Sequence, residues 1–93
     1  MVNKYEVVLV YSVANGEEAA NALKEKFNDL IAKNGTVENV DDWGKRRLAY
    51  LINDETDGYY VFYTFTAEPA FPAELERIAK ITDGVLRIMT IKK

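Results

Sequence analysis

The order of two periodic patterns along this chain limits the folds available to it. Four segments alternate apolar and polar residues, as half-buried β-strands do: residues 4–12, 36–52, 59–66 and 85–91. Two others repeat apolar residues at spacings of three and four, the period of an amphipathic helix: residues 17–34 and the segment between Pro72 and Asp83. The sequence therefore predicts the order β-α-β-β-α-β.

This order is the split βαβ, or ferredoxin-like, arrangement of the α+β class. Right-handed crossovers then place both helices on one face of a four-stranded antiparallel sheet. The chain has 93 residues, of which 48% are hydrophobic, which suits one domain with its own core. We therefore expect a single ferredoxin-like domain over residues 1–93.

Short local signals predict where the elements begin and end. Asn15 and Gly16 offer turn and capping chemistry before the first helix, and Gly35 is expected as its left-handed C′ residue. Gly44 interrupts the second strand and predicts a bulge or bend. Residues 53–58 are polar and predict the turn of a hairpin between the second and third strands.

One face of the predicted sheet has no helix to cover it. Charged strand residues should mark this open face, because an unpaired buried charge is costly; they are Lys4, Glu6, Arg47 and Arg87. Alternation places these apolar residues beside them: Val8, Val10, Ala49, Tyr60, Phe62, Met89 and Ile91. The opposite parity predicts the core: Tyr5, Val7, Leu9, Leu48, Val61, Phe65, Leu86 and Ile88. Such an apolar open face predicts a partner surface, for another protein or for a second copy.

Composition excludes several kinds of site. The chain has no cysteine and no histidine, which removes disulfides, thiolate metal sites and the usual general base. We expect no cofactor and no metal. The net charge is −3, so nucleic acid could be bound only by a local basic patch. No apolar run is long enough to cross a bilayer, and the lack of cysteine fits a reducing, intracellular setting.

The strongest local motif is residues 43–52, WGKRRLAYLI, in which three consecutive basic residues follow a predicted bend. Residues 44–52 of this motif closely resemble the signature of the bacterial small-subunit ribosomal protein six (bS6) family. The resemblance extends to residues 4–6 at the first strand, 58–60 at the third and 85–91 at the last. It covers essentially the whole chain and has the same element order.

The resemblance implies a structural, non-enzymatic protein of the small ribosomal subunit in the cytoplasm. Members pair with small-subunit ribosomal protein eighteen, and the pair binds the central domain of the small-subunit ribosomal RNA during assembly. The residues implied for RNA binding are Lys45, Arg46, Arg47, Arg87, Lys92 and Lys93. The open face of the sheet and its adjacent edge would then contact the protein partner.

Three other functions remain open at this point. An RNA-recognition-motif-like binder of single strands has the same element order, but Asp57 and Tyr60 depart from its third-strand motif. A dimeric ferredoxin-like ligand-sensing module suits the apolar open face but leaves the basic cluster unexplained. A small hydrolase would need an anion-binding loop after the first strand, and residues 12–16 contain no arginine or lysine there.

Overall fold

A computed structural model of the chain describes residues 2–52 and 55–93, with the backbone alone for residues 49–52. Its elements follow the predicted order. They are β1 (Asn3–Ser12), α1 (Glu17–Asn34), β2 (Gly35–Ile52), β3 (Glu55–Ala67), α2 (Phe71–Ile81) and β4 (Val85–Lys92). The four strands form one antiparallel sheet in the order β2-β3-β1-β4. The ferredoxin-like prediction is confirmed.

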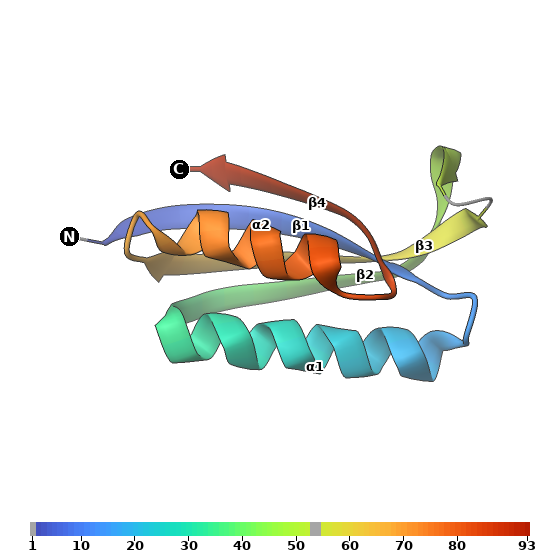
Figure 1. Cartoon of the computed structure of the whole chain (residues 1–93), viewed down its shortest axis with the longest axis horizontal. Helices are drawn as coiled ribbons and strands as arrows, with labels where there is room; N and C mark the ends of the chain where they lie inside the picture. Colours follow the sequence, from blue (N-terminus) through green and yellow to red (C-terminus); the bar gives the residue numbers. More distant parts are fainter. Residues whose placement is uncertain (1, 53–54) are drawn as a thin grey trace.

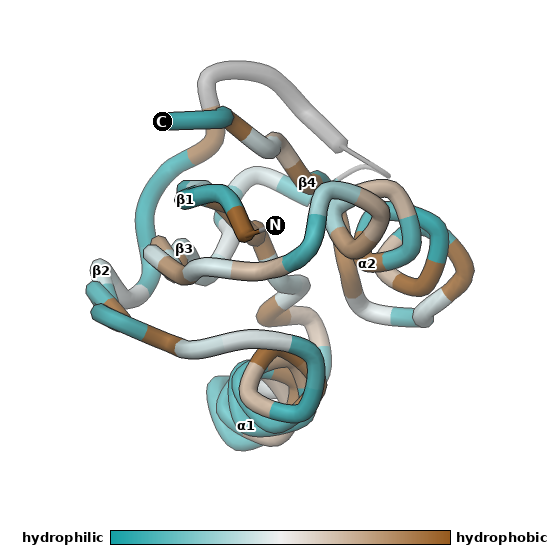
Figure 2. The backbone as a smooth tube through the Cα atoms, turned by 90° about the vertical axis from the view of Figure 1, so that its left-hand side faces the viewer, coloured by the Kyte–Doolittle hydropathy of each residue, from teal (hydrophilic) through white to brown (hydrophobic). Residues whose placement is uncertain are grey.

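Both helices lie on the same side of the sheet, as predicted, with α1 along the β2 and β3 half and α2 towards β4 (Figures 1 and 2). The core between the helices and the sheet contains large apolar residues at every second position of the two central strands, β1 and β3. Its members on the strands are Tyr5, Val7, Leu9, Tyr11, Tyr59, Val61, Tyr63, Phe65 and Ala67, and those on the helices are Ala20, Phe27, Ile31, Phe71, Leu75 and Ala79. Ile88 packs against this core as predicted.

A second, smaller apolar contact forms on the opposite face, around Gly58. A Cβ built on Gly58 would lie 2.5 Å from Val10 Cγ1, 3.1 Å from Leu48 Cδ2 and 3.7 Å from Leu86 Cδ1. Only glycine therefore fits where these three side chains converge. Leu48 is buried, as predicted for a core residue, but the predicted helix-side position of Leu48 and Leu86 is wrong, because register shifts in β2 and between β1 and β4 turn them to the open face.

Two predicted turns differ from the structure. Gly35 is not a left-handed C′ residue: its φ of −174° is extended, and β2 follows α1 without a loop. Glycine is required there for another reason, since a Cβ would lie 2.1 Å from the carbonyl oxygen of Thr66. The polar segment at 55–58 is strand, so β3 begins earlier than predicted; residues 53 and 54 of the predicted turn lie outside the described residues.

The first helix begins without a side-chain cap. Gly16 is its N-cap residue, with a φ of +94°, and Asn15 makes no capping hydrogen bond. Glu17 and Glu18 fill the first turn and compensate, because carboxylates are favourable near the positive end of the helix dipole. The helix therefore depends on its buried face and its terminal charges.

Candidate protein and nucleic-acid interface

The central feature of the candidate site is the predicted bulge in β2. The register between β2 and β3 shifts between Asp42 and Gly44, so that Trp43 is the extra residue. Gly44 has a φ of +73°, a backbone conformation that favours glycine. Its amide donates a hydrogen bond of 2.9 Å to Asp42 Oδ1, which closes the bulge.

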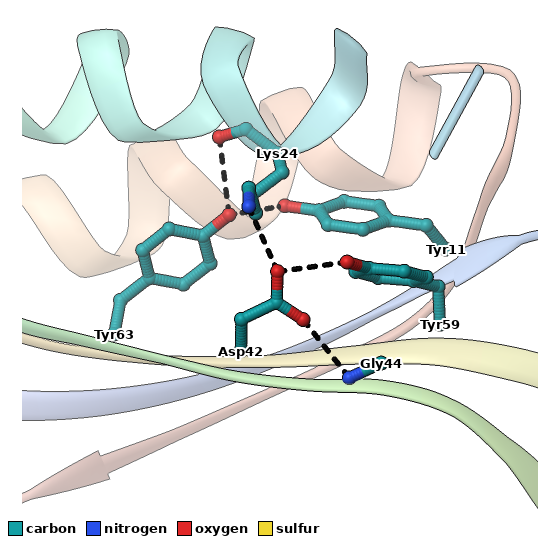
Figure 3. A network of polar contacts seen from close by, with 6 residues as sticks. All are labelled: Tyr11, Lys24, Asp42, Gly44, Tyr59 and Tyr63. Atoms are coloured by element: carbon teal, nitrogen blue, oxygen red, sulfur yellow. Dashed lines mark hydrogen bonds and ion pairs between the residues drawn. The ribbon is translucent and has the colours of Figure 1, made fainter. Parts of the chain in front are cut away.

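The same aspartate ties the bulge to helix α1 (Figure 3). Asp42 Oδ2 accepts from the Lys24 ammonium at 2.8 Å and from the Tyr59 hydroxyl at 2.7 Å. Three donors from α1, β3 and β2 thus meet on one carboxylate. No pattern in the chain pointed to this contact.

Two buried tyrosines continue the network under α1. The hydroxyl of Tyr63 donates to the carbonyl oxygen of Lys24 at 3.2 Å and lies 2.8 Å from the hydroxyl of Tyr11. Each hydroxyl therefore has a polar partner inside the apolar core, as buried phenols require. These contacts join side chains of β1 and β3 to the backbone of α1.

This environment shifts the pKa values of the network. Burial acts to raise the pKa of Asp42, but the hydrogen bonds from Lys24 and Tyr59 and the Lys24 charge outweigh it, so the pKa lies below its usual value. Burial, with the neighbouring Asp42 carboxylate, raises the pKa of Tyr59 to about 12. Burial also raises the pKa of Tyr11 and of Tyr63.

These shifts predict a loss of stability in alkali. The native state keeps the Tyr59 proton up to a pKa of about 12, whereas the unfolded chain releases it near the ordinary value of 10.0. The unfolded state then binds fewer protons, so the stability present below pH 10 should fall as the pH rises towards 12. Each such tyrosine adds about 1.4 kcal/mol per pH unit to the slope. Urea titrations between pH 8 and 12 measure the free energy of unfolding and its slope against pH. Tyr63→Phe removes one of the buried tyrosines with a raised pKa and should make this slope less steep. An unchanged slope would contradict the raised pKa of Tyr63.

An apolar surface lies on the open face of the sheet, opposite the face on which Asp42 contacts α1. Trp43 stacks on Phe62 with ring centroids 4.4 Å apart, and its indole nitrogen donates to Asp41 Oδ2 at 2.8 Å. Strand pairing sets Phe62 beside Val8 and Val8 beside Met89. We call the following residues the open-face patch: Val8, Trp43, Tyr60, Phe62, Met89 and Ile91. Trp43, Met89 and Ile91 are 45%, 42% and 45% exposed.

The patch agrees only in part with the residues predicted for the partner face. Val8, Tyr60, Phe62, Met89 and Ile91 lie on the open face as expected. Val10 has the same parity but is only 3% exposed, because Leu48 and Leu86 cover it near Gly58, so the expectation of an accessible Val10 is wrong. The side chain of Ala49 lies outside the described residues. Trp43 was missed as a patch residue, since strict alternation cannot place the extra residue of a bulge.

Ion pairs border the patch at the end where β1 begins. The Lys4 ammonium lies 3.1 Å from Glu38 Oε1, and the Lys93 ammonium lies 3.6 Å from Glu6 Oε2. Lys4 and Glu6 are thus on the open face, as predicted from their charge. An apolar centre with a charged border is the usual composition of a protein–protein interface.

The predicted RNA-binding residues lie at two ends of the sheet. Lys45, Arg46 and Arg47, which we call the basic cluster, directly follow the bulge and are exposed. Arg87 is exposed on β4, opposite Val10, at the same end of the sheet. Lys92 pairs with Tyr5 on β1, whereas Arg87 pairs with Val10. Tyr5 and Val10 are five positions apart, so Lys92 lies about 17 Å along the strand from Arg87. Lys92 and Lys93 are therefore not part of the same surface as the basic cluster.

The bulge also changes which side of the strand each basic residue faces. Arg46 pairs with Gly58, whose Cβ direction is towards the open face, whereas Arg47 pairs with Asp57 on the opposite parity. The prediction that Arg47 marks the open face is wrong for this reason, and Arg46 takes that place. In Figure 1 this end of β2 rises out of the plane of the sheet, beyond the end of α2.

Two other kinds of site can be checked in the described part of the chain. Within residues 2–52 and 55–93, no group of three histidine, cysteine, aspartate or glutamate residues could hold a metal ion. No helix described in the structure is long and apolar enough to span a membrane. The surface does provide two binding features: the open-face patch, which includes the bulge residue Trp43, and the basic cluster, which directly follows the bulge.

Comparison with known proteins gives a consistent family. The family model described as ribosomal protein S6 matches residues 4–92. The small ribosomal subunit protein bS6 of Clostridium novyi is 47% identical over 91 residues, covering 97% of this chain and 96% of that protein. That of Clostridium perfringens is 48% identical over 93 residues, covering 99% of this chain and 98% of its own length.

A solved structure supports the same fold. The crystal structure of 30S ribosomal protein S6 from Thermotoga maritima superposes with a TM-score of 0.91, at 24% identity, over 100% of this chain and 89% of that one. With the near full-length match of the family model and the curated relatives, the chain belongs to the ribosomal protein S6 family.

Proposed function

We propose that this protein pairs with small-subunit ribosomal protein eighteen through the open-face patch, and that the pair binds the central domain of the small-subunit ribosomal RNA. In the coarser sense it is a structural, non-enzymatic protein of the small ribosomal subunit, like the relatives that share its sequence. The observation that carries the proposal is the bulge in β2, which presents an apolar patch and a basic cluster next to each other.

The open-face patch has the properties of a protein interface. Its aromatic members, Trp43, Tyr60 and Phe62, belong to the residue types that contribute most to binding energy. Trp43 is held by its stack on Phe62 and its bond to Asp41, so little side-chain entropy would be lost on binding. Polar and charged neighbours around the patch can set the orientation of the partner.

The basic cluster has the properties of a phosphate-binding site. Among the residues that the structure describes, no carboxylate forms an ion pair with Lys45, Arg46 or Arg47, and the Arg46 guanidinium donates a hydrogen bond of 3.1 Å to the carbonyl oxygen of Lys45. Guanidinium groups that are not already paired can donate two parallel hydrogen bonds to phosphate oxygens. Since such contacts position a protein without reading sequence, specificity would come from the folded RNA and the partner.

Net charge supports a two-component interaction. The chain carries 15 acidic and 12 basic residues, for a net charge of −3, so its long-range field repels RNA. A basic partner docked on the open face would offset this repulsion next to the basic cluster. We therefore expect RNA binding by the pair and little RNA binding by this chain alone.

A single-strand binder of the RNA-recognition type fits the surface less well. Such proteins stack bases on exposed aromatic rings of the central strands. Here the ring of Phe62 is already stacked on Trp43, with centroids 4.4 Å apart, and is only partly exposed. A base would have to displace the indole, so this face is better suited to a protein.

A binding titration tests the proposal. The chain would be titrated with a central-domain ribosomal RNA fragment, with and without protein eighteen, at two salt concentrations. We expect binding that requires the partner and weakens with salt, because phosphate contacts release counterions. Tight, salt-dependent binding of unstructured RNA by the chain alone would instead support the alternative function, a single-strand RNA binder of the RNA-recognition type. Self-association with no binding to partner or RNA would support the dimeric module and overturn the proposal.

A further inference from the structure

Both surfaces of the proposed function depend on the same few backbone atoms. The open-face patch reaches β2 only through Trp43, the extra residue of the bulge, and the basic cluster begins one residue after Gly44. A change in the bulge would therefore move the indole and rotate Lys45, Arg46 and Arg47 together. Whatever fixes the bulge controls the relative position of the two surfaces.

The geometry points to Asp42 as a positioning residue that holds the bulge against helix α1 and so sets the protein-binding and RNA-binding surfaces relative to each other. This inference rests on the proposed function for its readout in binding. Its structural part stands on three contacts to one carboxylate: Gly44 N at 2.9 Å, Lys24 Nζ at 2.8 Å and Tyr59 Oη at 2.7 Å. Asp42 is assigned to neither surface, because its side chain points to the helix side.

The two carboxylate oxygens of Asp42 have separate roles. Oδ1 accepts from the Gly44 amide and closes the bulge locally, as an aspartate side chain does in an Asx-type turn. Oδ2 accepts from Lys24 and Tyr59 and joins the bulge to α1 and β3. The first contact gives the bulge its shape, and the second fixes its position relative to the rest of the fold.

Exposure argues that this network positions the bulge rather than stabilising the whole fold. The side chains of Lys24 and Asp42 are 28% and 33% exposed, and ion pairs that solvent can reach contribute little to global stability. The core beneath contains enough apolar contact to hold α1 without them. The loss of Asp42 should therefore be seen at the bulge first.

Asp42→Asn separates the two roles. An asparagine keeps one carbonyl oxygen for the Gly44 amide, but its amide nitrogen cannot accept a hydrogen bond from the Lys24 ammonium. Asp42→Ala removes both contacts. The matched control is Asp29→Asn on the exposed side of α1, which removes the same charge outside the network.

The experiment measures local structure and binding on the same variants. Amide hydrogen exchange at Gly44 reports the bulge, and the fluorescence of Trp43, the only tryptophan in the sequence, reports its stack on Phe62. Asp42→Ala should speed exchange at Gly44 by about tenfold and shift the emission to longer wavelength. Asp42→Asn should leave the exchange nearly unchanged but weaken assembly with protein eighteen and RNA by about tenfold.

Substitution at the other end of the contact provides a rescue test. Lys24→Met should reproduce the binding loss of Asp42→Asn, whereas Lys24→Arg keeps a cationic donor and should restore most of the affinity. A purely structural role would instead lower the denaturant midpoint of both lysine variants in proportion to their binding. Denaturant midpoints close to that of the unmodified chain are expected for all of them.

The outcomes separate this inference from the proposed function. If Asp42→Ala leaves the Gly44 exchange and the Trp43 emission unchanged, the positioning role is overturned, whatever the binding shows. If both respond but the unmodified chain binds neither partner nor RNA, the proposed function fails and the structural role of Asp42 stands. If the Asp29→Asn control weakens assembly equally, the effect is one of net charge and the inference is overturned.

Discussion

Replacing Arg46 and Arg47 together by glutamate should weaken binding of the partnered complex to RNA by about a hundredfold. Each arginine would lose a charge-assisted contact to phosphate, worth about 1.5 kcal/mol, and two such losses correspond to roughly that factor. Both side chains are exposed, so the fold should be unaffected. Filter binding or fluorescence anisotropy with the central-domain fragment measures the change, and circular dichroism checks the fold.

The salt dependence gives a second, independent readout of the same variant. If both arginines contact phosphates, the plot of log affinity against log salt should become less steep. Its slope should decrease in magnitude by about 0.9 for each lost phosphate contact, or about 1.8 in all. The charge control is Lys26→Glu with Lys80→Glu, one on each helix and both exposed on the other side of the sheet. Equal losses in the two double variants would mean that net charge alone matters and that the basic cluster is not the contact.

A third variant, Lys92→Glu with Lys93→Glu, tests the other end of the sheet. These lysines lie about 17 Å along the strand from the row of Arg87, and Lys93 already pairs with Glu6 at 3.6 Å. We therefore expect at most a threefold loss of RNA affinity from this change. A loss as large as that of the Arg46 and Arg47 variant, in binding to the same fragment, would extend the RNA surface along β4.

The fold could be predicted because each element has a clear period. The helix over residues 17–34 and the strand over residues 36–52 match α1 and β2 to within one residue, since burial against a single core imposes the pattern. The face covered by the helices was also predictable, as Tyr5, Val7 and Leu9 alternate with charged Lys4 and Glu6. Each of these inferences uses a regular repeat.

Inference from the sequence became less reliable where the repeat is broken. The bulge at Gly44 was predicted, but its effect on the residues beyond was not, and one extra residue reversed the faces of Arg47 and Leu48. A bulge must be counted into the alternation, and the sequence does not say on which side of the glycine the extra residue lies. The structure identifies it as Trp43.

Contacts between side chains that are far apart in the sequence produce no periodic pattern, so they could not be predicted from it. Lys24 and Asp42 are separated by 18 positions in the chain and meet only because α1 lies over β2. Neighbouring Asp41 and Asp42 look like a solvated pair, yet one contacts the Trp43 indole and the other the helix. Such pairs depend on the packing of the elements, which periodicity does not specify.

Truncating Phe62 to alanine should weaken binding to protein eighteen by about thirtyfold while leaving the chain folded. A large aromatic residue at the centre of an interface typically contributes about 2 kcal/mol, and Phe62 also holds Trp43 in place. The loss of stability should be about 1 kcal/mol, since the side chain is only partly buried and loses one aromatic stack. Calorimetric titration with the partner and urea unfolding measure the two quantities.

Phe65→Ala is the matched comparison, because it makes the same truncation on the other face of the same strand. Phe65 is fully buried, at 0% exposure, with Tyr5 and Phe71 against its ring, so unfolding should become easier by about 3–5 kcal/mol. Below its unfolding temperature this variant should still bind the partner. If instead Phe62→Ala were the more destabilising change and left partner binding intact, the open-face patch would be part of the folding core and the partner would have to bind elsewhere.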